Sequence, residues 1–231
     1  FFFFFKTVTF DGKAWTCTQY SYSVDVISST LFYNIVVNLP FQTCTNHILT
    51  TASGDVVNAA NNFTHTDGII NGLFTLDNNL TINSGADGGT GTITFDGTGA
   101  QTYFQAAGSQ RTCKIAVNKA SGAVTPAAGN VDFTVQGYNQ ILGDFTAPSG
   151  NFSIGGDLYG SQTVFAHQAG TFSHNNGTVV INPNQSGCTQ RTFTIDVIPA
   201  TLFSSITVNG IQSCGINPIV TTAAGDVATC V

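Results

Sequence analysis

Two segments of this chain, far apart in the sequence, repeat each other closely. Residues 7–58 and 178–229 align at a constant offset of 171, with one single-residue slip near Cys44 and Cys214. Repetition of this length is typical of proteins that stack similar structural units. It therefore predicts a scaffold and argues against a catalyst. Matching runs include Asp25-Val26-Ile27 with Asp196-Val197-Ile198, and Thr30-Leu31-Phe32 with Thr201-Leu202-Phe203.

A weaker copy lies between these two segments. The pattern x-Ile-x-Val-Asn occurs at residues 34–38, 114–118 and 205–209, at spacings of 80 and then 91. The repeating unit is therefore about half of 171 residues long, and a version with a cysteine pair alternates with a plainer one. We expect a partial cysteine-bearing unit at residues 1–60, a plain unit at 61–150 and a second cysteine-bearing unit at 151–231.

The composition favours strands over helices. The chain contains no Glu and no Met, and Lys and Arg together number 6, whereas Phe alone numbers 19. Runs such as residues 131–135 and 193–197 carry apolar side chains at every second position, which is the period of a strand with one buried face. Asp-Gly and Asn-Gly pairs between these runs indicate turns. The chain is therefore predicted to be all-β.

Two repeat architectures fit this pattern. A parallel β-solenoid uses coils of roughly 20–30 residues, so each unit would span several coils. Tandem β-sandwich modules of the immunoglobulin-like kind need roughly 100 residues each, which is also close to the observed spacing. We favour the solenoid because short strand–corner–strand segments recur, as at residues 143–158, and no Pro/Ser-rich linker separates the units. The units can then form one continuous solenoid.

The six cysteines form a partly duplicated set. Cys17 and Cys44 recur together as Cys188 and Cys214, so we predict the disulfides Cys17–Cys44 and Cys188–Cys214. The two remaining cysteines can pair within the chain, bridge to a neighbouring subunit or remain free thiols. Disulfides would place the protein outside the reducing cytosol. The two remaining cysteines are Cys113 and Cys230.

Low charge excludes several classes of partner. Only 8% of residues are charged, the net charge is −6, and no basic cluster is present, so nucleic acid is not an expected partner. No apolar run reaches the length of a membrane span. Low-charge β proteins rich in Thr, Asn and Gly are typical of secreted surfaces, so we expect an extracellular or cell-surface location. Residues 1–5 are all Phe and lack the features of a signal peptide.

No catalytic constellation stands out. The sequence lacks the usual nucleophile, metalloprotease and phosphate-loop motifs, and without Glu any paired-carboxylate chemistry would need two Asp. His65 and His174 occupy matching Phe-x-His positions, which suggests packing or a turn. Asp25 matches Asp196, and Asp55 matches Asp226, so both pairs are interpreted as structural. We expect no enzyme activity and no cofactor, with weak calcium binding at residues 77–79 and 86–89 as the alternative.

Aromatic residues leave a sugar-binding role open. Trp15 and the tyrosines Tyr20, Tyr22 and Tyr33 could form a platform for glycans, although core packing explains most of them. Four Asn-x-Ser/Thr triplets, at Asn62, Asn79, Asn151 and Asn184, leave glycosylation open.

Residues 172–182 followed by residues 202–209 resemble the β-strand repeats of large secreted prokaryotic surface proteins. In that family a Thr-Phe-x-His-Asn-Gly-Thr-Val segment leads into a Phe-Tyr-Asn-Leu-Thr-Ile-Asn segment, which residues 31–38 match closely. The middle unit departs from the pattern, because residues 111–114 replace the aromatic pair. The resemblance implies adhesin, sheath or filament roles without catalysis.

These observations lead to three functional hypotheses. The first is a structural subunit of an extracellular filament or surface layer, a homopolymer joined end to end through exposed terminal strands. The second is a carbohydrate-binding adhesin fragment, and the third is a polysaccharide-active β-helix enzyme. The joining segments would be residues 1–10 and 219–231. The expected assembly residues are Val8, Phe10, Ile219, Val220, Val227 and Val231.

Overall fold

The protein is all-β. The computed structural model describes residues 5–12, 19–27, 30–40, 46–108, 111–155, 162–183, 188–210 and 214–231, and the described residues contain strands and no helix. The strands are β1 Phe5–Asp11, β2 Ser21–Val24, β3 Leu31–Asn38, β4 Ile48–Thr51, β5 Val57–Ala59, β6 Phe63–Ile70, β7 Leu73–Leu76, β8 Leu80–Phe95, β9 Gln101–Gln105, β10 Arg111–Pro126, β11 Phe133–Val135, β12 Tyr138–Thr146, β13 Asn151–Ile154, β14 Gln162–His167, β15 Phe172–Ser173, β16 Thr178–Ile181, β17 Thr192–Val197, β18 Leu202–Phe203, β19 Ser205–Val208, β20 Ile219–Thr222 and β21 Thr229–Cys230.

Alternation of apolar and polar side chains produces these strands. In β11, Phe133 and Val135 are fully buried on either side of the half-buried Thr134. In β17, Phe193, Ile195 and Val197 are buried and the residues between them are half-buried. One face of these two strands is thus removed from water, as the period of two predicts.

Every pairing between described strands is parallel, and the pairings form three ladders. Ladder A joins β1, β3, β6, β8, β9, β10, β12 and β15, and β18 and β21 continue it. Ladder B joins the start of β3 to β5, β7, the end of β8, the first half of β10, the first half of β12, β14, β17 and β20. Ladder C joins β2, β4, the end of β6, the middle of β8, the start of β10, β11, β13, β16 and β19. The chain passes through A, C and B in turn, and we call one such passage a circuit.

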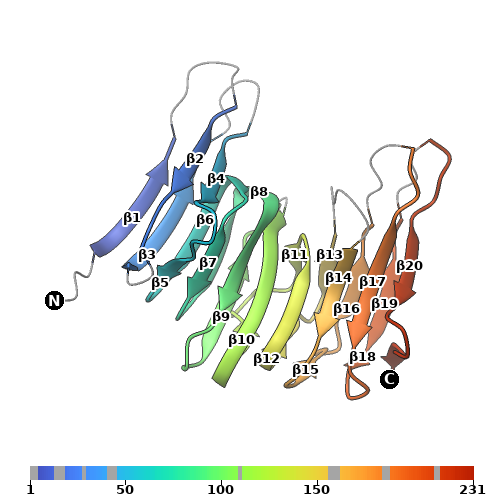
Figure 1. Cartoon of the computed structure of the whole chain (residues 1–231). Helices are drawn as coiled ribbons and strands as arrows, with labels where there is room; N and C mark the ends of the chain where they lie inside the picture. The colour runs from blue at the N-terminus through green and yellow to red at the C-terminus, as the bar shows by residue number, and fades with distance from the viewer. Residues whose placement is uncertain are drawn as a thin grey trace.

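Figure 1 shows the result as one long stack of strands, from β1 at the amino-terminal end to β20 at the carboxy-terminal end. Neighbours within a ladder are one circuit apart in sequence. The circuits are long at both ends: Asn34 bonds to Thr7 across a separation of 27 residues, and the same separation recurs in the last circuit. They are short towards the middle, where Asn78 bonds to Asn61 across only 17 residues.

The 171-residue repetition is preserved strand by strand, but each strand falls on a different ladder. From β1, ladder A advances seven strands to β15, and the copy of β1 is β16, the next strand along the chain, in ladder C. Likewise β2 of ladder C recurs as β17 of ladder B, and β4 of ladder C as β20 of ladder B. The repeated block therefore spans seven circuits and one further ladder.

A single apolar core runs along the stack. Rings from successive circuits contact each other: Tyr103 and Phe133 have centroids 4.3 Å apart, and Phe133 and Phe152 lie nearly parallel at 5.7 Å. The tyrosine hydroxyl of Tyr103 donates a hydrogen bond to the carbonyl oxygen of Thr146 at 3.0 Å. Aromatic stacking of this kind adds to the free energy gained by burial.

The all-β prediction is confirmed. Sandwich modules require antiparallel sheets, whereas the ladders of the described residues are parallel throughout. The unit boundaries at residues 60 and 150 do not interrupt the ladders, because β3 pairs with β6 and β11 pairs with β13 across them.

Candidate assembly surfaces

The amino-terminal end of the stack presents strands that are paired on one side. Among the described strands β1 pairs with β3 alone, and β2 pairs with β4 alone. Val8 and Phe10 of β1 pair with the fully buried Ile35 and Val37, so they share the inward-facing side, but they are only half-buried. Tyr22 of β2 pairs with the fully buried Leu49 and is 36% exposed.

The carboxy-terminal end has the same character. Within the described part of the chain, β19 pairs with β16 alone and β20 with β17 alone. Val208 pairs with the buried Ile181 and yet is 51% exposed, because no other described strand pairs with β19 on its second side. Val220 pairs with the fully buried Phe193 and is half-buried. At both ends, therefore, apolar side chains on the core-facing side of the strand are partly exposed to solvent.

The six residues expected to mediate assembly fall into two groups. Val8, Phe10 and Val220 lie on the inward-facing side of open strands, as described above. The other three are exposed: Ile219 lies on the opposite side of β20, and Val227 and Val231 flank the last strand. Val208 is not among the six residues predicted to mediate assembly, and Tyr22 is predicted only as part of a sugar-binding platform. The sequence signal for both residues is the strand period of two, which puts Val208 on the same face as Ile206 and Tyr22 on the same face as Tyr20.

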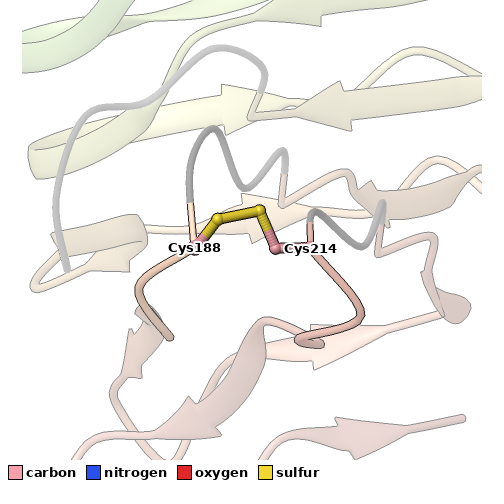
Figure 2. The surroundings of a disulfide bond; sticks show 2 residues. All are labelled: Cys188 and Cys214. Carbon is pink, nitrogen blue, oxygen red and sulfur yellow. A yellow bond between two sulfur atoms is a disulfide. The ribbon is translucent and has the colours of Figure 1, made fainter.

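A disulfide ties the last circuits together. Cys188 and Cys214 are bonded, with their Cα atoms 5.2 Å apart, as the duplication predicts (Figure 2). The two residues are separated by 26 positions in the sequence, about one circuit, so the bond joins consecutive passages of the chain. The other predicted pair, Cys17–Cys44, lies outside the described residues.

The two remaining cysteines are free thiols, so they do not pair with each other. Cys113 is fully buried, so it is inaccessible to a neighbouring subunit, and burial raises the pKa of its thiol to about 12. Cys230 is exposed in β21. The two lie about five circuits apart, roughly 24 Å at the spacing of neighbouring strands, too far for a disulfide.

Asparagine side chains fix the register of the first circuits. The Nδ2 group of Asn61 donates to Oδ1 of Asn34 at 3.0 Å, and Asn78 donates to Asn61 at 2.7 Å. Asn34 also donates to the hydroxyl of Thr7 in β1 at 3.2 Å. Asn62 and Asn79, two of the possible glycosylation sites, belong to a parallel series in which each carboxamide oxygen accepts a backbone N–H from the next circuit.

Buried histidines close corners of the stack. His65 contacts the carbonyl oxygen of Gly68 at 2.7 Å through Nε2 and the hydroxyl of Thr112 at 3.1 Å through Nδ1. His167 makes the same two contacts, with Gly170 at 3.1 Å and Thr201 at 2.7 Å. Burial lowers the pKa of both, to about 4 for His65. His174, the sequence match of His65, is half-buried and accepts a hydrogen bond from Asn176 N–H. Its role is in a turn.

Two aspartate pairs raise the question of acid–base chemistry. Burial, and then the charge of Asp67, raise the pKa of Asp87. Burial, and then Asp77, raise the pKa of Asp96. Lys119 lies near the second pair; its side chain is 1% exposed and its Nζ donates to Gly97 O, Gly99 O and Gln101 Oε1. Burial lowers the pKa of Lys119 although both aspartates oppose this. These contacts hold the corner of a circuit.

The remaining aspartates that the repeat duplicates are structural where contacts are seen. Oδ2 of Asp55 accepts the Val26 N–H at 2.8 Å, and Oδ2 of Asp226 accepts the Val197 N–H at 2.8 Å. In the part of the chain that the structure describes, no three His, Cys, Asp or Glu side chains converge on a metal-sized site. Weak calcium binding at residues 77–79 and 86–89, the alternative raised from the sequence, stays a prediction.

The proposed sugar platform is only partly visible. Trp15 and Asn184 lie outside the described residues. Tyr20 and Tyr22 lie near His47, with ring centroids 5.6 and 6.2 Å away, while Tyr33 is 44% exposed on β3. A separate groove of about 510 Å³ lies between β9 and β11, where Phe104 and Val131 are exposed.

Comparison of this chain with protein families, curated proteins and solved structures finds no match. No helix of membrane-spanning length and hydropathy occurs among the described residues.

Proposed function

We propose that this chain is a parallel β-solenoid that serves as a structural subunit of an extracellular filament or surface layer, joining end to end with copies of itself. The proposal for the solenoid is supported by the three parallel ladders and by the repeated A, C, B order of the chain. A solenoid in which each unit contacts only its neighbours leaves an uncovered surface at each end.

The observation that carries the assembly proposal is the state of the two ends. At each end a strand that has a described neighbour on one side only displays apolar side chains on its inward-facing side, half-buried or exposed. Open strand edges of this kind recruit further strands unless they are blocked by charge, proline or a covering segment. Val208 at one end and Tyr22 at the other are 51% and 36% exposed, with buried partners one circuit further in.

An extracellular location fits the covalent structure. The Cys188–Cys214 disulfide is of the kind that persists in oxidising compartments. The resemblance of residues 31–38 and 172–182 to secreted prokaryotic surface repeats points the same way, towards a sheath, filament or adhesin.

The test compares two equally exposed valines. Val208→Asp places a charge on the open end, where assembly would bury it without a partner, and we expect it to abolish filaments in negative-stain micrographs and to leave monomers in sedimentation velocity. Val131→Asp changes a residue 54% exposed on the side of the stack and should assemble like the unchanged chain. Deleting residues 1–10 should also leave monomers. Filaments unaffected by Val208→Asp, or an unchanged chain that never assembles, would contradict the proposal.

The groove between β9 and β11 favours glycan binding as the second candidate function. Phe104 is 37% exposed, and Asp132 at the same groove has one carboxylate oxygen engaged by the Asn151 N–H at 2.7 Å. An exposed ring beside a carboxylate suits a sugar, which offers an apolar face and hydroxyl donors. A glycan array should then show binding that Phe104→Ala removes, and binding no higher than background would count against this candidate.

A further inference from the structure

The two ends of the stack match each other in size, which bears on how copies would join. In the first circuit, hydrogen-bonded partners on successive passages are 27 residues apart, and so are those in the last circuit. Circuits towards the middle are shorter: Asn61 and Asn78 are 17 residues apart, and Asn71 and Thr90 are 19 residues apart. The two ends therefore have circuits of equal length in sequence, a length that also recurs inside the stack at β12–β15 and β13–β16.

The ladders also set which strands would meet. If each ladder continues in its own line, the open strand of ladder C at the carboxy-terminal end, β19, receives the open strand of ladder C at the amino-terminal end, β2. Along ladder C the inward-facing positions run from Val208 through Ile181, Ile154 and Val135. At the other end they run through Leu49 to Tyr22.

A second joint would turn the next copy by one ladder and seat β1 on the open edge of β19. The duplicated sequence gives no precedent for this joint. Although β19 is the copy of the end of β3, the edge of β3 that β1 contacts corresponds to the edge of β19 that β16, the copy of β1, already occupies. The two joints place different residues beside Val208: Tyr22 in the first, Phe10 in the second.

We infer that copies of this chain join by straight continuation of the ladders, with β2 of one copy seated on β19 of the next and Tyr22 lying over Val208. This inference rests on the proposed assembly and specifies its contact. Straight continuation keeps the order A, C, B unbroken, and it covers at one step the exposed inward-facing residues of both strands. Turning by one ladder would leave β2 facing β20, where Tyr22 would meet the more deeply seated Val220.

Disulfide trapping distinguishes the joints. Neighbouring parallel strands lie about 4.8 Å apart, within the Cα separation that a disulfide spans, and Cys188–Cys214 already bridges successive passages at 5.2 Å. In a Cys230→Ser background, the chain carrying Tyr22→Cys and Val208→Cys should form a ladder of oxidised polymers on non-reducing gels. The chain carrying Phe10→Cys and Val208→Cys should not, and neither should any single-cysteine variant.

The outcomes separate the joint from the assembly itself. Trapping by the Phe10 pair alone, or filaments with no trapping by either pair, would overturn the straight joint and leave end-to-end assembly standing. Absence of particles larger than a monomer in the Cys230→Ser parent would overturn both. A second pair, Tyr20→Cys with Ile206→Cys, reports on the same joint if the first variant fails to give the circular dichroism spectrum of its parent.

Discussion

The middle of the stack and its two ends are built from the same three ladders but differ in circuit length and in the burial of their core-facing side chains. Circuits away from the ends need as few as 17 residues, and the core there packs rings such as Phe133 and Phe152 at a centroid distance of 5.7 Å with almost no exposure to solvent. End circuits need 27 residues and leave Tyr22 and Val208 partly in water. Among the described strands, an end strand has a neighbour on one side only, so its inward-facing side chains are only partly covered although they are apolar.

This difference teaches that the ends are held by other means than the core. The first circuit carries the hydrogen bonds of Asn34 with Thr7 and with Asn61, and the carboxy-terminal circuits carry the Cys188–Cys214 disulfide. Hydrogen-bonded and covalent ties fix register where apolar burial is incomplete. In the middle, the packing of buried rings adds to polar contacts such as those of His65 and Lys119.

Removing a ring from the middle should have the largest effect on stability. Phe133→Ala deletes a fully buried ring that contacts Tyr103 and Phe152, and it should lower the free energy of unfolding by about 4 kcal/mol in urea titrations. Val220→Ala removes two methyl groups from a half-buried end position and should cost about 1 kcal/mol or less. Equal losses from the two changes would contradict the distinction between middle and end.

Adding one methyl group at a glycine should also destabilise the inner circuits more than the carboxy-terminal end. In Gly170→Ala the new Cβ would lie 1.9 Å from the carbonyl oxygen of Gly143, and φ is +86°, so a loss of about 3 kcal/mol is expected in the same titration. Gly225 near the carboxy-terminal end has a φ of +92° and open space around it. Gly225→Ala therefore carries the backbone strain alone, about 1 kcal/mol. A Gly170 variant as stable as the Gly225 variant would show that the circuits can slide apart.

Opening the end disulfide should cost somewhat less than the loss of the ring. The double change Cys188→Ser with Cys214→Ser removes a link between positions separated by 26 in the sequence and should lower the free energy of unfolding by about 3 kcal/mol. Thermal melts in the absence of reductant give the measurement. Cys230→Ser, which alters an exposed free thiol, is the matched control and should leave the melting temperature unchanged.

Acid should destabilise the fold through the corner histidine His65. Because burial lowers the pKa of His65 to about 4, the native state keeps it neutral while the unfolded state takes up a proton below about pH 6.5. The unfolded state binds more protons in that window, so stability falls with falling pH, by about 2 kcal/mol between pH 6.5 and 5.

The control uses a substitution that the chain itself contains. Gln140 donates to Gly143 O at 2.6 Å in the way that His65 meets Gly68, so His65→Gln should fold and should lose this part of the pH dependence. The same slope in the unchanged chain and in the His65→Gln chain would assign the acid sensitivity to other groups, such as His167.

The strands, their buried faces and one disulfide could be predicted from the sequence, because they depend on residues close together in the chain or on identity between the two copies. The alternation at residues 133–135 and 193–197 predicted buried faces correctly, and the duplicated cysteines predicted the Cys188–Cys214 bond. Strand pairings are also duplicated: β1 pairs with β3 at the same residues of the repeat as β16 pairs with β19, and β2 with β4 as β17 with β20. These features depend on neighbours in the chain or on identity between copies.

What could not be predicted depends on circuit length. A circuit takes 17 residues in one place and 27 in another, so an offset of 171 residues does not reveal how many circuits it spans. The sequence therefore could not predict that β2 belongs to ladder C and its copy β17 to ladder B. For the same reason His65 was matched to His174, although His167 makes its contacts. Asp77 and Asp96 are well separated in the sequence, and only a short circuit brings their charges together.

The direction of the ladders has a mechanical consequence. Backbone N–H···O=C bonds between parallel strands point from one circuit to the next, so in this stack they lie along its length. Tension applied to the two ends of a polymer would load these bonds in series, circuit after circuit, and the weakest circuit would yield first. A covalent tie such as Cys188–Cys214, placed at the circuit that receives the pull, would prevent the last coil from peeling away before the rest of the molecule shares the force.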